Sequence, residues 1–222
     1  MIEQMAETRG GQADRYEAVL FDLLSALVDS WSLWDAVAGD PPTGRRWRNR
    51  YLQLTYATGD YVPYESVVAQ AARAEGLDDE LAFRLTARWD ELQPWPEAPS
   101  VLEHLSGAVR VGVVTNCSNE LGHRAAARLG VGLDVVATAE DAGAYKPRPQ
   151  PYLHALQCLD LPPERVLFVA GSRFDLPGAA SVGLPVWWHN RLHLDRGALP
   201  APIAEYDTLT PLLDYVLADR DR

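Results

Sequence analysis

The chain has 222 residues, 47% hydrophobic and 23% charged, and this balance is typical of a globular protein with a sizeable buried core. Its formal net charge of -11 makes nucleic acid and anionic membranes poor partners. The two cysteines are far apart in sequence, which argues against a disulfide framework and favours a reducing cytoplasm. No apolar run reaches membrane-spanning length, and we expect residues 1–14 to be a flexible polar tail without a signal peptide.

The first structured element is an apolar run over residues 18–21 that ends in Asp22 and is followed by the small residues Ser25 and Ala26. Open α/β sheets place their chemistry in loops at the carboxyl ends of short buried strands. The same pattern also fits an aspartate that only caps a turn. We therefore predict a strand here, with Asp22 as a candidate catalytic carboxylate.

The next segment, residues 31–96, has apolar residues at helical spacing and no strand pattern. A Gly-Asp-Pro-Pro run at residues 39–42 breaks the first helix, and Pro94-Trp95-Pro96 ends the segment as a stiff connector. Five of the seven tryptophans lie in this segment, either as its own core or as a dry roof over Asp22. We predict a helical cap domain with helices over about residues 31–37, 45–58, 64–75 and 79–92.

After residue 97 the pattern alternates between amphipathic helices and short β-branched strands, which is typical of βαβ units and a mostly parallel sheet. We expect strands over residues 109–115, 134–138, 166–170 and 185–188, and helices over residues 100–105, 120–129, 151–159, 176–182 and 209–217. The fold class is therefore α/β, a doubly wound sheet formed by residues 15–30 plus 97–222, with the helical cap inserted after the first strand.

Polar residues follow several of these strands, and the carboxyl ends of parallel strands meet at one edge of the sheet. They are Asp22, then Thr115-Asn116, then Lys146, then Ser172 with Asp175. An ammonium group beside a carboxylate keeps the carboxylate ionised, which a carboxylate nucleophile requires. We expect these side chains to form one site.

These motifs, FDLLSAL, VVTNCSN, YKPRPQPY and FVAGSRFDLPGA, appear in an order that resembles the haloacid dehalogenase superfamily of hydrolases. The resemblance extends from about residue 16 to residue 216, and the helical insertion lies where that superfamily inserts its first type of cap. Within the superfamily the chain is most similar to the type II 2-haloacid dehalogenases, because Trp47-Arg48 in the cap is similar to the WR pair that carries their substrate-binding arginine.

The resemblance implies catalytic roles for three residues. Asp22 matches the nucleophile, Lys146 the lysine that pairs with it, and Asp175 the acid that orients the hydrolytic water. It also implies a substrate-binding set: Arg48 for the halide or carboxylate, Thr115 and Asn116 for substrate and nucleophile, Tyr152 as support, and Ser172 and Leu24 at substrate-facing positions. A homodimer is a further implication of the resemblance.

Leu24 and Ser172 separate the two main branches of this superfamily. The phosphatases place a second aspartate at the position of Leu24 to protonate the leaving alkoxide, and an acid at the position of Ser172 to help hold Mg²⁺. A halide needs no proton to leave. We therefore expect a hydrolase that displaces halide from a small 2-haloalkanoic acid through an aspartyl ester, with no cofactor and no metal.

Two alternatives stay open. One is a magnesium-dependent phosphatase of the same fold, which would use the same nucleophile and lysine. The other is a non-catalytic protein that binds a small acid or a protein partner, because Leu24, Ala26 and Ser172 each depart from a catalytic pattern. At the position of Ala26 the dehalogenases carry a threonine, and Ser25 could supply a nearby hydroxyl instead.

Three further signals favour ordinary structural roles. His189 and His193 stand four residues apart, a spacing that can bind a metal on a helix, but they follow a predicted strand and lack the glutamate of a metalloprotease motif. We expect surface or core-edge histidines and no metal site. Cys117 has no adjacent histidine and should pack as a small hydrophobic residue. Arg48 lies in a basic cluster, and its side chain could either bind an anion or pair with an acid of the cap.

Overall fold

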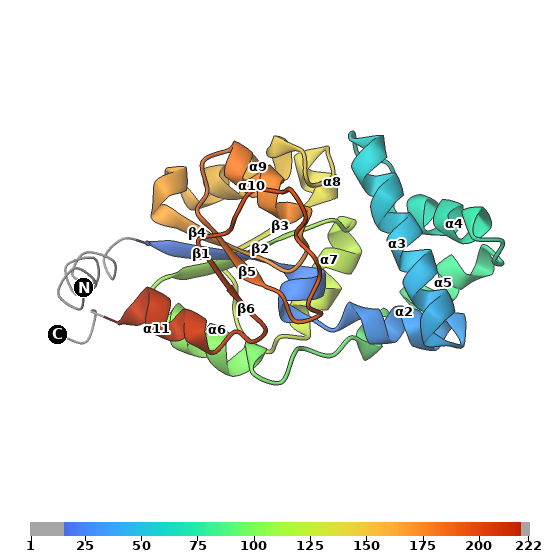
Figure 1. Cartoon of the computed structure of the whole chain (residues 1–222), viewed down its shortest axis with the longest axis horizontal. Coiled ribbons are helices and arrows are strands. Elements are labelled where there is room, and N and C mark those ends of the chain that lie inside the picture. Colours follow the sequence, from blue (N-terminus) through green and yellow to red (C-terminus); the bar gives the residue numbers. More distant parts are fainter. Residues whose placement is uncertain (1–15, 219–222) are drawn as a thin grey trace.

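The core of the protein is a six-stranded sheet, seen in a computed structural model that describes residues 16–218 (Figure 1). The strand order is β3-β2-β1-β4-β5-β6, and every neighbouring pair is parallel. The strands are β1 Ala18–Asp22, β2 Arg110–Thr115, β3 Val135–Thr138, β4 Val166–Ala170, β5 Val186–His189 and β6 Ala204–Tyr206. The predicted α/β class is confirmed, and the predicted tail over residues 1–14 lies outside the described residues.

Helices cover both faces of this sheet (Figure 1). They are α6 Ala98–Ser106, α7 Asn119–Ala127, α8 Ala139–Ala142, α9 Pro149–Leu159, α10 Asp175–Ser181 and α11 Pro211–Leu217, with a 3₁₀ turn η3 at Pro163–Arg165. Apolar residues of α6, α7 and α11 pack against one face, and those of α9 and α10 against the other. Strands buried on both faces explain why β1 and β4 are continuous apolar runs rather than alternating ones.

A second group of helices lies beyond the carboxyl ends of the strands (Figure 1). These cap helices are α2 Ser30–Ala38, α3 Pro41–Thr58, α4 Tyr64–Ala74 and α5 Glu80–Ala87, followed by a 3₁₀ turn η2 at Trp89–Glu91. Helix α3 begins four residues before the predicted start, because the Asp40 side chain caps it and proline is well suited to the first helical position. The Pro41-Pro42 pair therefore starts a helix as well as separating two.

Four short elements were not predicted: η1 Leu23–Leu27, α8, η3 and β6. Strand β6 has no apolar run, since two of its three residues are exposed, and it forms by pairing with β5 at the edge of the sheet. The segment η1 is one turn of π-helix that follows β1 directly, and Asp22 caps its start. Such turns depend on tertiary packing around them and have no clear sequence signature. Within residues 16–218, no helix combines the length and apolarity needed to cross a membrane.

The tryptophans of the cap helices serve both of the purposes considered above. Trp47 and Trp89 are fully buried, and their indole N–H groups donate to the carbonyls of Val68 and Leu121 at 3.1 and 2.8 Å. They form structural core. Trp34 packs on the Trp47 ring at 4.4 Å between centroids, and it also lines the pocket that contains Asp22. One aromatic cluster therefore supports the cap helices and roofs the pocket.

Replacing Trp89 by alanine should lower the free energy of unfolding by about 3–5 kcal/mol, because it removes a fully buried ring and leaves the Leu121 carbonyl without its donor. Phe83→Ala is the matched control, since Phe83 is 77% exposed on α5 and should cost no more than about 0.5 kcal/mol. Urea denaturation of both variants measures the difference. Equal losses would show that the ring of Trp89 is not part of the core.

Candidate active site

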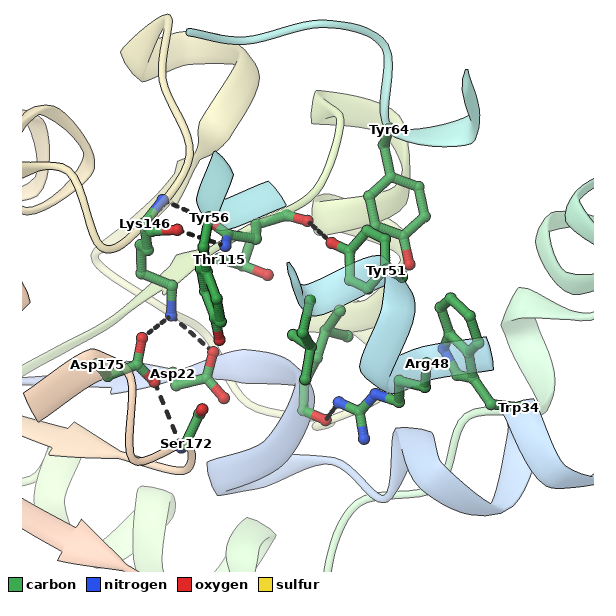
Figure 2. A pocket seen from close by; sticks show the side chains of 13 residues that line it. Asp22, Trp34, Arg48, Tyr51, Tyr56, Tyr64, Thr115, Lys146, Ser172 and Asp175 are labelled. Atoms are coloured by element: carbon green, nitrogen blue, oxygen red, sulfur yellow. Dashed lines mark hydrogen bonds and ion pairs between the residues drawn. The ribbon is translucent and has the colours of Figure 1, made fainter. Parts of the chain in front are cut away.

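The site is built on a buried ion triad at the carboxyl edge of the sheet (Figure 2). The ammonium nitrogen of Lys146 lies 2.7 Å from Asp22 Oδ1 and 3.1 Å from Asp175 Oδ1. All three side chains are at most 9% exposed. Asp22 ends β1, Asp175 begins α10, and Lys146 precedes α9, so three separate segments bring these charges together.

The other carboxylate oxygen of Asp22 is held by the π-turn that follows it. Oδ2 accepts hydrogen bonds from the Ser25 amide at 2.9 Å, the Ser25 hydroxyl at 2.5 Å and the Ala26 amide at 3.3 Å. Ser25 thus supplies the hydroxyl that Ala26 cannot, a possibility that the sequence left open. Gly171 allows this packing, because a Cβ there would lie 2.3 Å from the Ala26 nitrogen.

The triad sets the charge of each of its members. Burial by itself would raise the pKa of Asp22, but the Lys146 ammonium and the hydrogen bonds from Lys146 and Ser25 outweigh it and hold the pKa below its usual value. Burial would lower the pKa of Lys146, and the two carboxylates raise it instead. Asp175 has fewer donors and shares the lysine with Asp22, so burial and the Asp22 charge raise its pKa to about 6. Near neutral pH, Asp22 is therefore an ionised carboxylate.

Asn116 positions the segment that carries Lys146. Its side-chain amide donates to the Lys146 carbonyl at 3.1 Å and its side-chain oxygen accepts from the Lys146 amide at 2.7 Å. The Asn116 carbonyl in turn accepts the Tyr51 hydroxyl of α3 at 2.9 Å. Thr115 lies beside it, fully buried at the end of β2, and its hydroxyl contacts the Cys117 sulfur at 3.5 Å. Both predicted residues line the pocket.

Tyr152 and Ser172 contact different oxygens of Asp175. The Tyr152 hydroxyl donates to Asp175 Oδ1 at 3.4 Å, and Tyr152 is not among the residues that line the pocket, so it contacts the acid without facing the pocket. The Ser172 amide donates to Asp175 Oδ2 at 3.4 Å, and the Ser172 side chain faces the pocket (Figure 2). The sequence had placed both residues in one substrate-binding set, and the geometry separates them.

Arg48 reaches into the pocket from α3 without a carboxylate partner. Its Nη2 donates to the Leu24 carbonyl at 3.4 Å, and its guanidinium stacks 3.7 Å above the Trp31 ring. Among residues 16–218, no acid lies within ion-pair distance of it, and its Nη1 has no hydrogen-bond partner. Of the two roles considered for Arg48, the geometry favours an anion binder, because a buried and unpaired cation is costly without one.

The pocket itself is small and mostly closed. Its free volume is about 30 Å³, which is the space of very few water molecules. The triad and Ser172 form its floor. Its walls come from Leu24, from Trp34, which was one of the tryptophans considered as a roof, and from cap residues that the sequence did not single out: Tyr51, Leu52, Tyr56 and Tyr64. On α3, the lining residues Tyr51, Leu52 and Tyr56 follow Arg48 by three, four and eight positions. This spacing marks one face of the helix and was the signal available in the sequence.

The histidines and the cysteine that the sequence assigned to structural roles, His189, His193 and Cys117, are all among the described residues. His189 is buried, and its Nδ1 lies 2.8 Å from the Ala26 carbonyl, so it braces the π-turn from below. His193 is exposed. No group of three His, Cys, Asp or Glu side chains that could hold a metal occurs within residues 16–218. Cys117 is fully buried, and burial raises the pKa of its thiol to about 12, which agrees with a packing role.

The residues at the site do not fit a magnesium ion. Each of the four carboxylate oxygens of Asp22 and Asp175 already accepts a proton donor from the protein. The Lys146 ammonium lies between the two carboxylates, where a hard cation would need their oxygens for itself. Ser172 and Leu24 add no carboxylate. The chemistry of this site therefore uses no metal.

The raised pKa of Asp175 predicts a pH effect on stability. From about pH 4 to pH 6 the unfolded chain ionises this group while the folded protein keeps its proton, so the folded state loses stability as pH rises. In Asp175→Asn the group no longer titrates. The unfolding free energy of the wild type minus that of the variant should fall across this window with a limiting slope of about 1.4 kcal/mol per pH unit. A difference that stays flat in denaturant titrations would contradict the raised pKa.

Comparisons with known proteins agree with this geometry. The family model of haloacid dehalogenase-like hydrolases matches residues 16–183. The chain is 28% identical over 194 residues to haloacetate dehalogenase H-2 of Moraxella sp. (strain B), covering 80% of this chain and 87% of that protein. It is 28% identical over 219 residues to (S)-2-haloacid dehalogenase H-109 of Pseudomonas putida, covering 90% and 98%.

Solved structures give the same result. A crystal structure of a dehalogenase with an intermediate complex superposes with a TM-score of 0.80 at 26% identity, covering 92% of this chain and 98% of that chain. L-2-haloacid dehalogenase from Xanthobacter autotrophicus with chloropropionic acid covalently bound has the same fold, with a TM-score of 0.78 at 21% identity and 89% and 96% coverage. Fold, motifs and relatives agree, and the chain belongs to the haloacid dehalogenase-like hydrolase family.

Proposed function

We propose that the protein is a 2-haloacid dehalogenase that hydrolyses small 2-haloalkanoic acids without a cofactor. The observation that carries the proposal is an ionised, buried Asp22 paired with Lys146 in a pocket whose far side carries the unpaired Arg48 guanidinium. Leu24 offers no proton to a leaving group, and a halide needs none. The relatives' names, haloacetate dehalogenase and (S)-2-haloacid dehalogenase, support the same reaction class.

In the first step, Asp22 attacks the carbon that bears the halogen. Oδ1 is the better nucleophile of its two oxygens, because it accepts one hydrogen bond from Lys146 while Oδ2 accepts three donors. A carbon–oxygen bond forms as the carbon–halogen bond breaks, and the halide leaves with the bonding electron pair. Arg48 stabilises that anion from across the pocket. The product of this step is an aspartyl ester.

In the second step, water cleaves the ester at the Asp22 carbonyl carbon. Oδ2 is now the carbonyl oxygen, and the amides of Ser25 and Ala26 that contact it form an oxyanion hole for the charge that develops there. Asp175, with a pKa of about 6, is ionised above that pH and accepts a proton from the water. Collapse of the intermediate breaks the bond from the aspartyl carbonyl carbon to the substrate oxygen, and that oxygen takes the proton from Asp175 and leaves as the hydroxyl of the 2-hydroxy acid. Asp22 then loses its proton to solvent and is again a carboxylate.

The two alternatives receive less support. A phosphatase would need a metal and a proton donor, and the carboxylate oxygens are occupied while Leu24 is apolar. A non-catalytic role was motivated partly by Ala26, and the Ser25 hydroxyl on Asp22 removes that motive. The domain bounds of 15–30 plus 97–222 and 31–96, a homodimer and a cytoplasmic location stay proposals.

Asp22→Asn should abolish halide release from chloroacetate and from both enantiomers of 2-chloropropionate, because a neutral amide is a poor nucleophile. Asp214→Asn on the exposed side of α11 is the control and should keep wild-type rates. Ion chromatography of released chloride, with and without EDTA, measures both. Full activity in Asp22→Asn would exclude the mechanism. No halide release from any of these haloacids, together with EDTA-sensitive hydrolysis of p-nitrophenyl phosphate, would exclude a dehalogenase function.

A further inference from the structure

Two buried polar groups in the pocket have no hydrogen-bond partner among residues 16–218: the Tyr64 hydroxyl and Nη1 of Arg48. Tyr64 has no exposed surface, and Arg48 is 4% exposed. Buried donors without partners cost free energy in a folded protein, so each such group calls for a reason. Both side chains line the same pocket, which points to one shared reason.

The Tyr64 ring is held in one position. Tyr64 is the first residue of α4, and its ring packs edge-on against Tyr51 at 5.2 Å and Trp89 at 5.7 Å between centroids. Figure 2 shows its hydroxyl directed toward the side of the pocket where Arg48 lies. Burial holds the pKa of Tyr64 well above its usual value, so the hydroxyl keeps its proton and is available as a donor.

The other phenols of the pocket differ from Tyr64. The Tyr51 hydroxyl already donates to the Asn116 carbonyl at 2.9 Å, and Tyr56 is half-buried with its hydroxyl in contact with Ser172. Within residues 16–218, Tyr64 is thus the pocket phenol that has a donor to spare. Tyr51 and Tyr64 form a matched pair of buried rings, one with its hydroxyl occupied and one without.

The position of the Tyr64 hydroxyl and of Arg48 Nη1 relative to Asp22 indicates which anion they would bind. Asp22 must attack the carbon on the side opposite the leaving group. In Figure 2, Asp22 and Lys146 lie on one side of the pocket, and Arg48 and Tyr64 lie on the other. The departing halide is therefore the anion that forms nearest to the two unpartnered donors, whereas the Lys146 side already holds its carboxylates.

We propose that Tyr64 donates a hydrogen bond to the departing halide beside Arg48, and so selects for the smaller halogens. This inference rests on the proposed dehalogenase function. A hydrogen bond to an ion strengthens as the ion gains charge and as the distance shortens. A chloride, being smaller than a bromide, therefore gains more from the Tyr64 hydroxyl, and a fluoride would gain most.

The test is Tyr64→Phe, assayed on chloroacetate and bromoacetate. Removing the hydroxyl should lower kcat on chloroacetate by about tenfold and on bromoacetate by about threefold. Tyr51→Phe is the matched control. Its hydroxyl acts on the Asn116 backbone and not on the leaving group, so its loss should lower both rates by one common factor. Circular dichroism of both variants verifies that they fold.

Product inhibition by chloride tests the same contact without comparing the turnover rates of the two acids. Chloride inhibits as a product, and its inhibition constant should rise about tenfold in Tyr64→Phe and stay unchanged in Tyr51→Phe. Equal losses on the two haloacids, with an unchanged chloride inhibition constant, would overturn the role of Tyr64 while leaving the dehalogenase function intact. A wild-type protein that releases no halide would instead mean that the proposed function itself fails.

Discussion

The interaction on which the rest of the site depends is the contact of one buried ammonium, Lys146, with two buried carboxylates. Two negative charges share one positive charge, so one unit of negative charge remains in a nearly dry pocket when both acids are ionised. Removing one partner of such a buried group costs about 3–5 kcal/mol, which is why each member has its own support. Asn116 holds the Lys146 backbone, the π-turn holds Asp22, and Tyr152 holds Asp175. This excess negative charge keeps Asp22 available as a nucleophile and leaves Asp175 able to take up a proton near neutral pH.

The cap helices and their connectors contribute positioning as well as a roof. The Tyr51 hydroxyl donates to the Asn116 carbonyl, and the indole of Trp95, in the connector, donates to the Ser25 carbonyl at 3.0 Å. In the other direction, the Tyr145 hydroxyl of the core donates to the Val62 carbonyl at 2.7 Å. The loop that holds Asp22, the loop of Asn116 and the segment of Lys146 are thus each tied to the helical insertion by a hydrogen bond. The segment that closes the pocket therefore also fixes the geometry beneath it.

The sequence predicted most of the sheet and the triad, because short β-branched runs and the charged residues after them are local signals. It could not decide the partner of Arg48, since that depends on which side of α3 faces the sheet. Strand β6 was missed because its residues gain order only by pairing with β5. Tyr64 was missed for a different reason: helical spacing places aromatic residues on one face, but it does not distinguish Trp89, which fills the core, from Tyr64, whose hydroxyl reaches the pocket. Contacts in three dimensions make that distinction.

In the proposed mechanism a covalent ester forms on Asp22, and water cleaves it at the aspartyl carbonyl. A single turnover in ¹⁸O-labelled water, with enzyme in excess over chloroacetate, tests this directly. Tandem mass spectrometry of the tryptic peptide over residues 16–45 then locates the label. We expect one ¹⁸O in the Asp22 side chain and an unlabelled hydroxy acid, because the oxygen of the product comes from Asp22. Label in the hydroxy acid of the first turnover, with Asp22 unlabelled, would mean that water attacks the substrate carbon itself and that no aspartyl ester forms.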